Sequence, residues 1–243
     1  PIVHKLKDYI RVMLEISVGF IAQSERLMAS TLEGFDGGVE NTLVLPNGYN
    51  ADLFYAVDFQ EQCRLRNKCE VFADRKESRK ILVYQGKMGP WYRDLEFIIE
   101  SAGRIRDCIL VCIGDGMLLE EFKAKATENV LFPGLLTLEQ VAQWTRAADG
   151  AVFPVNDCSP IAISEYVGCG LPVAAAGPRT DWLLSDGRGV MVDDNREWDS
   201  ALSQLMGMNR RLPGEVSVFA ERLRWSQLTT QLECFFYSIG DLD

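Results

Sequence analysis

The feature that most constrains the fold is an alternation of short apolar runs and helix-like segments that begins near Lys80. Such apolar runs are typical of buried strands, and they fall at residues 81–86, 108–116, 129–134, 150–155, 171–177 and 189–193. Apolar side chains recur at helical spacing between them, in residues 95–105, 117–126, 138–148 and 161–168. Strands joined by helices favour right-handed crossovers and a parallel sheet covered on both faces. We therefore expect an α/β domain with a doubly wound, Rossmann-like parallel sheet.

The first part of the chain has a less regular pattern. Residues 2–16 and 25–32 have helical spacing, while residues 18–24 and 41–50 are typical of strands that end in turns. The only histidine, His4, falls in the first of these helices, which favours a structural role. Residues 58–79 are rich in charge and poor in periodicity, so we interpret them as a surface excursion or a linker.

Charge and cysteine content exclude several classes of function. The 243-residue chain carries 25 Lys and Arg against 35 Asp and Glu, and this net charge of −10 argues against nonspecific binding of nucleic acid or anionic lipid. No apolar run approaches the roughly 18 residues of a membrane span. Seven cysteines without a Cys-x-x-Cys pair, beside one histidine, indicate free thiols in a reducing cytosol and exclude a zinc site. We expect a cytoplasmic protein without a bound metal.

Ligands of a doubly wound sheet bind beyond the carboxyl ends of its strands. The loops that lie there follow Gln85, Ile113, Phe132 and Phe153. The loop after the second strand, IGDG at residues 113–116, is not a dinucleotide fingerprint, because Leu119 stands where the last glycine is needed. A domain that binds a dinucleotide of the NAD type is therefore disfavoured.

The strongest candidate site begins at Ser159, which is followed by Pro160. A hydroxyl N-cap followed by Pro at the first helical position is a helix-start signal. Backbone N–H groups at a helix N-terminus bind phosphate through directed donors and the positive end of the helix dipole. The donors expected here belong to Ile161, Ala162 and Ile163.

Two carboxylates flank these donors. Glu165 lies on the second turn of the helix, where it could accept hydrogen bonds from vicinal hydroxyls such as those of a ribose, and Asp157 precedes the helix and could reach a second polyol. The alternative is that Ser159 and Pro160 merely start a helix and that Glu165 is a solvated side chain.

The loop after the first strand is a second candidate. Gly86 permits a close approach of the backbone, while Lys87 and Arg93 supply cations for a diphosphate. A turn with incidental surface cations is the alternative interpretation of this segment.

Taken in order, these motifs resemble those of GT-B glycosyltransferases of the large family 4, or group 1, type. LVLPNGYNADLF at residues 43–54 is similar to the junction that leads into their C-terminal domain. The order continues with Gly86–Lys87, IGDG, NVLFPG at residues 129–134, ADGAVFPV at residues 148–155 and SPIAISEYVGCGLPV at residues 159–173. Each motif is loose alone, but the ordered set is specific and covers the chain from about Val18 to Tyr237.

The resemblance implies a role for each matching residue. In the family's pair of acids, the second contacts the nucleotide ribose and matches Glu165, and the first contacts the transferred sugar and matches Asp157. The helix N-terminus between them, Ser159 to Ile163 with Pro160 and Ala162, holds the diphosphate. Gly86, Lys87 and Arg93 match the basic first loop, and the backbone at Gly134 and Leu135 meets the base. Departures are Ala162 in place of the family's Lys and Asp157 in place of Glu.

The resemblance also divides the chain into regions. Residues 1–45 match the end of an N-terminal, acceptor-side domain, residues 46–79 form the linker or excursion, and residues 80–237 form the nucleotide-sugar-binding domain. VGFIAQSERL at residues 18–27 is similar to the strand-turn-helix that ends the first domain. Because most of that domain has no counterpart and the first residue is Pro, we expect a processed chain or part of a longer one.

The function implied is transfer of a sugar from a nucleoside-diphosphate sugar to a hydroxyl of a sugar, lipid or protein acceptor, as in polysaccharide biosynthesis. Retention at the anomeric carbon and catalysis without a metal or other cofactor are properties of the family. The resemblance leaves room for membrane contact only through the missing part of the N-terminal region, on the cytoplasmic face of the membrane. The alternative is a catalytically inactive nucleotide-sugar-binding or regulatory module, which the changes at Asp157 and Ala162 favour.

Overall fold

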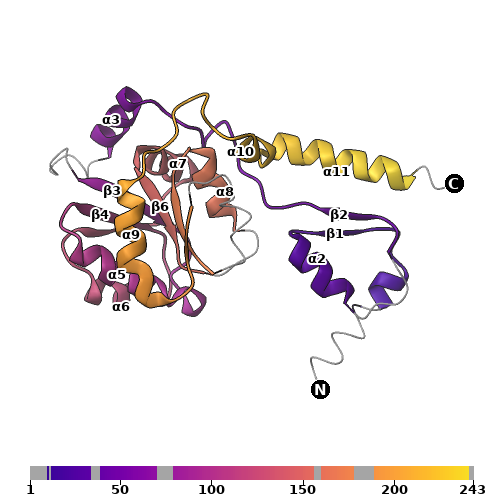
Figure 1. Ribbon diagram of the computed structural model, residues 1–243, viewed down its shortest axis with the longest axis horizontal. Coiled ribbons are helices and arrows are strands. Elements are labelled where there is room, and N and C mark those ends of the chain that lie inside the picture. Colours follow the sequence, from indigo (N-terminus) through magenta and orange to yellow (C-terminus); the bar gives the residue numbers. More distant parts are fainter. Residues whose placement is uncertain are drawn as a thin grey trace, which may run out of the picture.

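The structure is a computed structural model that describes residues 10, 12–33, 39–69, 79–155, 160–177 and 189–240. It has two parts (Figure 1). One is an α/β body built on a six-stranded sheet, and the other is an arm in which β1 (Phe20–Ala22), β2 (Thr42–Val44) and α2 (Glu25–Leu32) lie beside α11 (Trp225–Gly240). The body carries all the candidate site residues that fall within the described ranges. The predicted residues Asp157 and Ser159 lie outside them.

The six strands of the body form one parallel sheet in the order β5-β4-β3-β6-β7-β8. Their bounds are Lys80–Gln85 for β3, Cys108–Ile113 for β4, Val130–Gly134 for β5, Gly150–Phe153 for β6, Val173–Ala176 for β7 and Gly189–Val192 for β8. The chain first adds strands on one side of β3 and then returns to the other side with β6. This reversal confirms the doubly wound sheet and sets its switch point between β3 and β6.

Alternate residues of the strands pack into two separate cores. Ile81 and Val83 of β3 face one core and Leu82 and Tyr84 face the other, and all four are buried. Helices that cover the first core are α3 (Phe59–Lys68), α7 (Leu138–Ala147), α8 (Ile161–Gly168) and α10 (Val218–Arg222). The second core is covered by α5 (Leu95–Arg104), α6 (Leu119–Lys125) and α9 (Trp198–Gly207). Burial on both faces explains why the strands are apolar throughout.

The segment interpreted as a surface excursion or linker contains helix α3, which packs on α7. Asp58 caps the helix, because its side chain accepts a hydrogen bond of 2.8 Å from the backbone N–H of Glu61. Only Gln62 and Leu65 of the helix are buried. A buried face this narrow gives almost no apolar periodicity, which is why the sequence pattern did not predict a helix here.

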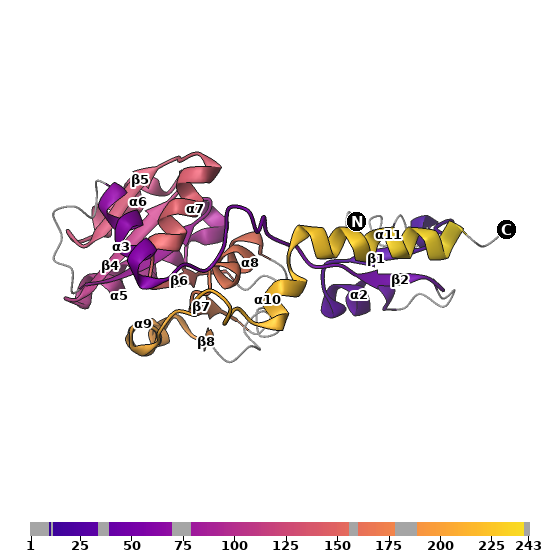
Figure 2. The same cartoon turned by 90° about the horizontal axis from the view of Figure 1, so that it is seen from above.

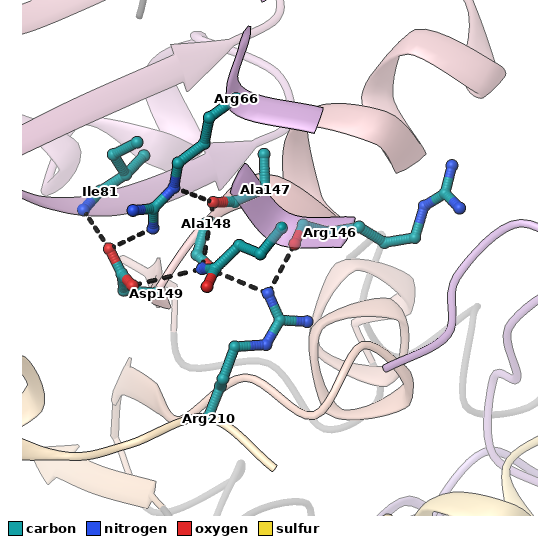
Figure 3. A network of polar contacts seen from close by, with 8 residues as sticks. Arg66, Ile81, Arg146, Ala147, Ala148, Asp149 and Arg210 are labelled. Atoms are coloured by element: carbon teal, nitrogen blue, oxygen red, sulfur yellow. Dashed lines mark hydrogen bonds and ion pairs between the residues drawn. The ribbon is translucent and has the colours of Figure 1, made fainter. Parts of the chain in front are cut away.

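Polar side chains from separate segments converge on the carboxyl end of α7 (Figure 3). Arg66 donates from Nε to the carbonyl of Ala147 over 2.9 Å, and Arg210 donates from Nη1 to the carbonyl of Ala148 over 3.1 Å. Asp149 accepts a hydrogen bond from the backbone N–H of Ile81 at 2.7 Å and pairs with Nη2 of Arg66 at 2.7 Å. The last carbonyls of α7 are thus satisfied by cations, as the helix dipole favours.

The arm combines segments from both ends of the described chain. The parallel strands β1 (Phe20–Ala22) and β2 (Thr42–Val44) pair with each other, α2 (Glu25–Leu32) connects them, and α11 (Trp225–Gly240) packs against them. A Cβ on Gly19 would lie 3.0 Å from the ring of Phe235, which shows how closely α11 approaches. Both views place the arm to one side of the six-stranded sheet (Figure 2).

The arm and the body meet at a neck, residues 46–50 and 223–225, where two chain segments run side by side. The backbone N–H of Tyr49 donates to the carbonyl of Leu223 over 2.9 Å, and that of Trp225 donates to the carbonyl of Tyr49 over 3.1 Å. A hollow of about 390 Å³ lies beside this neck, with Tyr55 and Glu221 in its lining. Gly168 is the only residue of α8 in this lining, and no residue of the loops after β3, β4 and β5 belongs to it.

The remaining expectations have mixed outcomes. Within the predicted first helix, residue 10 and residues 12–15 are helical, and His4 lies outside the described residues.

The six cysteines in the described ranges are free thiols, and burial raises the pKa of Cys69 to about 11 and that of Cys108 to about 12. Among the helices described, none is both long and apolar enough to cross a membrane. Two short 3₁₀ helices, Pro90–Tyr92 and Asn195–Glu197, complete the described elements.

Candidate functional site

Three loops at the carboxyl ends of β3, β4 and β5 are joined by backbone hydrogen bonds. Gly86 donates to the carbonyl of Ile113 over 3.0 Å, and Gly114 donates to the carbonyl of Gly134 over 3.0 Å. One step further from the sheet, Met88 donates to the carbonyl of Asp115 over 2.9 Å. We call these three joined loops, residues 86–88, 114–116 and 134–135, the loop platform.

Glycine is required where the loops of this platform touch. Gly114 has a φ of +135°, and a Cβ placed on it would lie 1.9 Å from the carbonyl oxygen of Gly86. A Cβ on Gly116 would lie 2.4 Å from the carbonyl oxygen of Met88. The glycines of the IGDG motif therefore serve the close packing of two loops, a role that needs no dinucleotide fingerprint.

Lys87 stands exposed on the platform. Its backbone carbonyl accepts a hydrogen bond of 2.7 Å from the hydroxyl of Tyr84 on β3, which holds the loop against the sheet. The Lys87 ammonium makes no ion pair with any part of the chain that the structure describes. No carboxylate among the described residues competes for this ammonium, and its contact with an anionic ligand stays a prediction.

Arg93 is placed differently from Lys87. Its Nη1 pairs with Oε1 of Glu121 on α6 at 2.9 Å, and the two side chains are 50% and 40% exposed. An ion pair this exposed contributes about 0–1 kcal/mol, so a phosphate could displace the carboxylate. The structure does not bring Arg93 and Glu165 into contact.

Gly134 and Leu135 form the outer edge of the platform. Gly134 has a φ of +80°, a conformation that favours glycine, and it leaves space around its Cα. The side chain of Leu135 is 77% exposed. The two residues thus present backbone and an apolar side chain beside the platform, at the place where a base was expected.

Helix α8 begins one residue later than the sequence predicted. Pro160 is the N-cap, with an extended backbone (φ −73°, ψ 127°), and Ile161 is the first helical residue. The assignment of Ser159 as N-cap and Pro160 as first helical residue was therefore wrong, because the φ of proline suits either position. Among the residues that the structure describes, no side chain caps this end of the helix. The N–H groups of the first turn, which include those of Ala162 and Ile163, therefore have no described side chain as partner.

Glu165 lies half-buried on the second turn of α8, and Nε2 of Gln85 donates a hydrogen bond to its Oε2. Burial raises the pKa of the Glu165 carboxyl from 4.5 to about 7, although the hydrogen bond from Gln85 acts in the opposite direction. The carboxyl is therefore not a freely solvated surface group. Gln85 is the last residue of β3, so this contact lies at the switch point of the sheet.

Two further side chains hold Gln85. The hydroxyl of Thr145 on α7 lies 3.0 Å from Gln85 Oε1, and the hydroxyl of Tyr166 accepts the backbone N–H of Gln85 over 2.8 Å. Burial raises the pKa of Tyr166 well above its usual value, so its hydroxyl stays neutral. Sequence reasoning missed Gln85, Thr145 and Tyr166 as site residues. The available signal was a polar glutamine at the end of an apolar run.

No group of three or more potential metal ligands occurs within the described ranges. In the described residues the arrangement consists of the N-terminus of α8, an exposed lysine, a glycine platform and a half-buried carboxyl that faces the end of β3. Such a set can bind an anion and a hydroxyl-bearing group together.

Comparison with known proteins identifies relatives of the body. The sequence model of the family described as glycosyl transferases group 1 matches residues 79–207, just over half of the chain. No curated protein sequence gives a significant match.

Solved structures resemble nearly the whole chain. HepE from Anabaena, in complex with UDP-glucose, is 17% identical over 96% of this chain and 68% of its own, with a TM-score of 0.70. Sucrose-phosphate synthase from Thermosynechococcus elongatus is 18% identical over 99% of this chain and 63% of its own, with a TM-score of 0.73. The chain thus spans about two thirds of their length. The likeness shows the shared Rossmann-like α/β fold.

Proposed function

We propose that this chain, which belongs to the glycosyl transferases of group 1, binds the nucleoside diphosphate of a sugar donor at the switch point of its sheet. The observation that carries the proposal is Glu165, a half-buried carboxyl one turn beyond the N-terminus of α8. That HepE structures hold UDP and UDP-glucose supports a donor of this class. The activity proposed is transfer of the sugar to an acceptor hydroxyl on a sugar, lipid or protein.

Each described residue has a task in this proposal. The ribose hydroxyls donate to the carboxylate of Glu165, and the diphosphate accepts hydrogen bonds from the first turn of α8. Lys87 lies on the loop platform as the cation that balances the phosphate charge. Negative charge develops on the diphosphate as the sugar departs, so these donors stabilise the transition state more than the ground state. The base rests near Gly134 and Leu135.

Other parts of the proposal rest on the family alone. Asp157 would contact the transferred sugar, transfer would retain the anomeric configuration, and neither a metal nor another cofactor would take part. Assignment to family 4, the cytoplasmic location and the division into residues 1–45, 46–79 and 80–237 also stay predictions.

Binding without catalysis is the second candidate function. It is favoured by Ala162 in place of the family's lysine, and by the ion pair that joins Arg93 to Glu121. Both features remove positive charge from the place where the leaving diphosphate needs it. The chain would then sense or store a nucleotide sugar.

Thermal unfolding with nucleoside diphosphates tests donor binding. A ligand at a hundred times its Kd stabilises the folded state by about 2.7 kcal/mol, so UDP, GDP or ADP should raise the Tm by several degrees. Glu165→Ala should lose most of this rise. Glu233→Ala, at an exposed position of α11, is the matched control and should keep it. A Tm that none of the three nucleotides changes would reject the proposal.

A turnover assay separates the two candidates. If the chain prefers UDP, we expect it to hydrolyse UDP-glucose slowly, with water accepting the glucosyl group and UDP released, and we expect Glu165→Ala to abolish that release. Release would reject the inactive module, whereas tight binding without release would favour it.

A further inference from the structure

The hydroxyl of Thr145 has two acceptors within reach and one hydrogen to give. It lies 3.0 Å from Gln85 Oε1 and 2.8 Å from the carbonyl oxygen of Val141, one turn earlier in α7. A threonine hydroxyl donates once and can accept at the same time. Only one of the two contacts can therefore use the hydroxyl hydrogen at any moment.

The amide of Gln85 joins this hydroxyl to Glu165. One end of the amide faces Thr145 and the other end faces the Glu165 carboxyl. Rotation of the amide by 180° exchanges its oxygen and nitrogen while the positions of the heavy atoms stay nearly unchanged. Gln85 is 9% exposed and Thr145 is fully buried, so water is not available to replace a missing partner.

Two complete sets of hydrogen bonds satisfy these groups. In the first, Thr145 donates to Gln85 Oε1 and Gln85 Nε2 donates to the ionised carboxylate of Glu165. In the second, a proton taken up from water sits on Glu165, which donates to Gln85 Oε1, and Gln85 Nε2 donates to the hydroxyl of Thr145. That hydroxyl then donates to the carbonyl of Val141, so the Thr145 hydroxyl, the Gln85 oxygen and the Glu165 carboxyl each have a partner in both sets.

We propose that Gln85 is a positioning residue for nucleotide binding, because it forms with Thr145 a two-state hydrogen-bond relay that follows the protonation of Glu165. The proposal rests on the proposed function in one respect, the contact of Glu165 with the ribose. In the first state the carboxylate can accept both ribose hydroxyls. In the second state the carboxyl holds a proton and offers fewer acceptor sites to the ribose.

Burial places the exchange between the two states near neutral pH, since it raises the pKa of Glu165 to about 7. Among the described residues, the titratable groups whose charges couple to Glu165 are Tyr166 on its own helix and Cys169 at the C-cap of that helix, and burial keeps both neutral.

The neighbouring elements add little charge. The strands β6 and β7 carry no titratable side chain. Arg146 of α7 lies over the ring of Tyr55, Glu221 of α10 pairs with Arg224, and burial raises the pKa of Tyr84 on β3 so that it stays neutral. Within the described part of the chain, Gln85 is the side chain that hydrogen-bonds to Glu165.

Nuclear magnetic resonance of the ligand-free chain tests the relay directly. With labelled glutamate carboxyls and glutamine side-chain amides, we expect the signals of Gln85 and Glu165 to titrate with one midpoint. Gln85→Met removes the donor to the carboxylate and should raise the Glu165 midpoint by about one pH unit. Gln227→Met, on the exposed side of α11, should leave it unchanged. Separate midpoints, or no change in Gln85→Met, would overturn the relay.

A second pair of variants covers the case in which Gln85→Met does not fold. Thr145→Ser keeps the hydroxyl and should preserve the common midpoint. Thr145→Val removes the hydroxyl from both sets of hydrogen bonds, so the midpoint should move and the amide signals should lose their titration. An amide that titrates normally in Thr145→Val would contradict the relay.

Binding of UDP across pH gives the functional readout. Affinity of the wild-type chain should fall below pH 7, by up to tenfold per pH unit. Gln85→Met should show the same fall at a higher pH and recover wild-type affinity at pH 9, which a merely structural defect would not do. Glu165→Gln lacks the carboxyl, so any pH dependence of binding that remains in this variant comes from the ionisation of UDP itself. If UDP does not bind, GDP and ADP take its place in this titration. Absence of binding of all three nucleotides at every pH would reject the proposed function, while the ligand-free titration would still decide the relay.

Discussion

The half-buried carboxyl of Glu165 lowers the free energy of unfolding once it is ionised. Its pKa is about 7 in the folded chain and 4.5 without the fold. Below pH 4.5 the group is protonated in both states and carries no penalty. As the pH rises from 4.5 to 7, the unfolded chain releases its proton first, so the free energy of unfolding decreases over this window.

Replacement of Glu165 should therefore stabilise the protein at the pH where it weakens binding. We expect Glu165→Gln to raise the free energy of unfolding by about 1–3 kcal/mol at pH 8 and to have no effect near pH 4.5. Urea denaturation at both pH values measures this. Glu233→Gln, which changes the same group at an exposed position, should have no effect at either pH. A variant less stable than wild type at pH 8 would contradict the assigned burial.

The sequence predicted some residues of the candidate site and missed others for a physical reason. Glu165 was predicted, and the start of α8 was predicted to within one residue, because a Ser-Pro pair and a carboxylate lie close together in the chain. Gln85 lies 60 residues from Thr145 and 80 residues from Glu165, and its role exists only through these contacts. A local pattern carries no information about partners at that separation.

The same limit applies to elements. The strands and helices α5 to α8 were predicted because burial on one or both sides imposes apolar periodicity on them. Helix α3 was missed because its attachment is polar, through Gln62, which donates to the carbonyl of Ala148 over 3.0 Å, and Arg66. Elements held by hydrogen bonds leave a weak hydrophobic pattern.

The pair formed by Arg66 and Asp149 should be a main attachment of α3 to the body. The side chains are 18% and 14% exposed, so removal of one partner leaves a poorly solvated charge. We expect Arg66→Met to lower the free energy of unfolding by about 3 kcal/mol, as measured by urea denaturation.

Two controls define this prediction. Arg64→Met removes an exposed partner of Glu61 on the same helix and should change stability by less than about 0.5 kcal/mol. Addition of Asp149→Asn to Arg66→Met should recover part of the loss, because it removes the uncompensated charge. Equal effects of Arg64→Met and Arg66→Met would show that burial of the pair contributes nothing.

The whole molecule joins two parts that bury very different amounts of apolar surface. The body has two cores on opposite faces of six strands, whereas β1, α2 and β2 contribute only a few buried apolar side chains, among them Ala22 and Met28. A two-stranded sheet is marginally stable unless other elements cover it. In the described chain that cover includes α11, which reaches the arm from the neck.

Hydrogen exchange should therefore differ between the two parts. We expect the backbone amides of β1 and β2 to exchange at least about a hundredfold faster than those of β3 and β4, because local opening exposes little apolar surface. Mass spectrometry of deuterated peptides measures both parts in one sample, so β4 serves as the internal reference. Equal protection would show that the arm and the body unfold as one cooperative unit.

The loop platform has a consequence for how such a site can diversify. Its three loops hold one another through main-chain groups and through glycines that no side chain can replace. The exposed side chains of Lys87 and Leu135 take no part in that scaffold. Evolution or mutagenesis can therefore exchange these side chains, and with them the preferred ligand, while the backbone of the loop platform keeps its conformation.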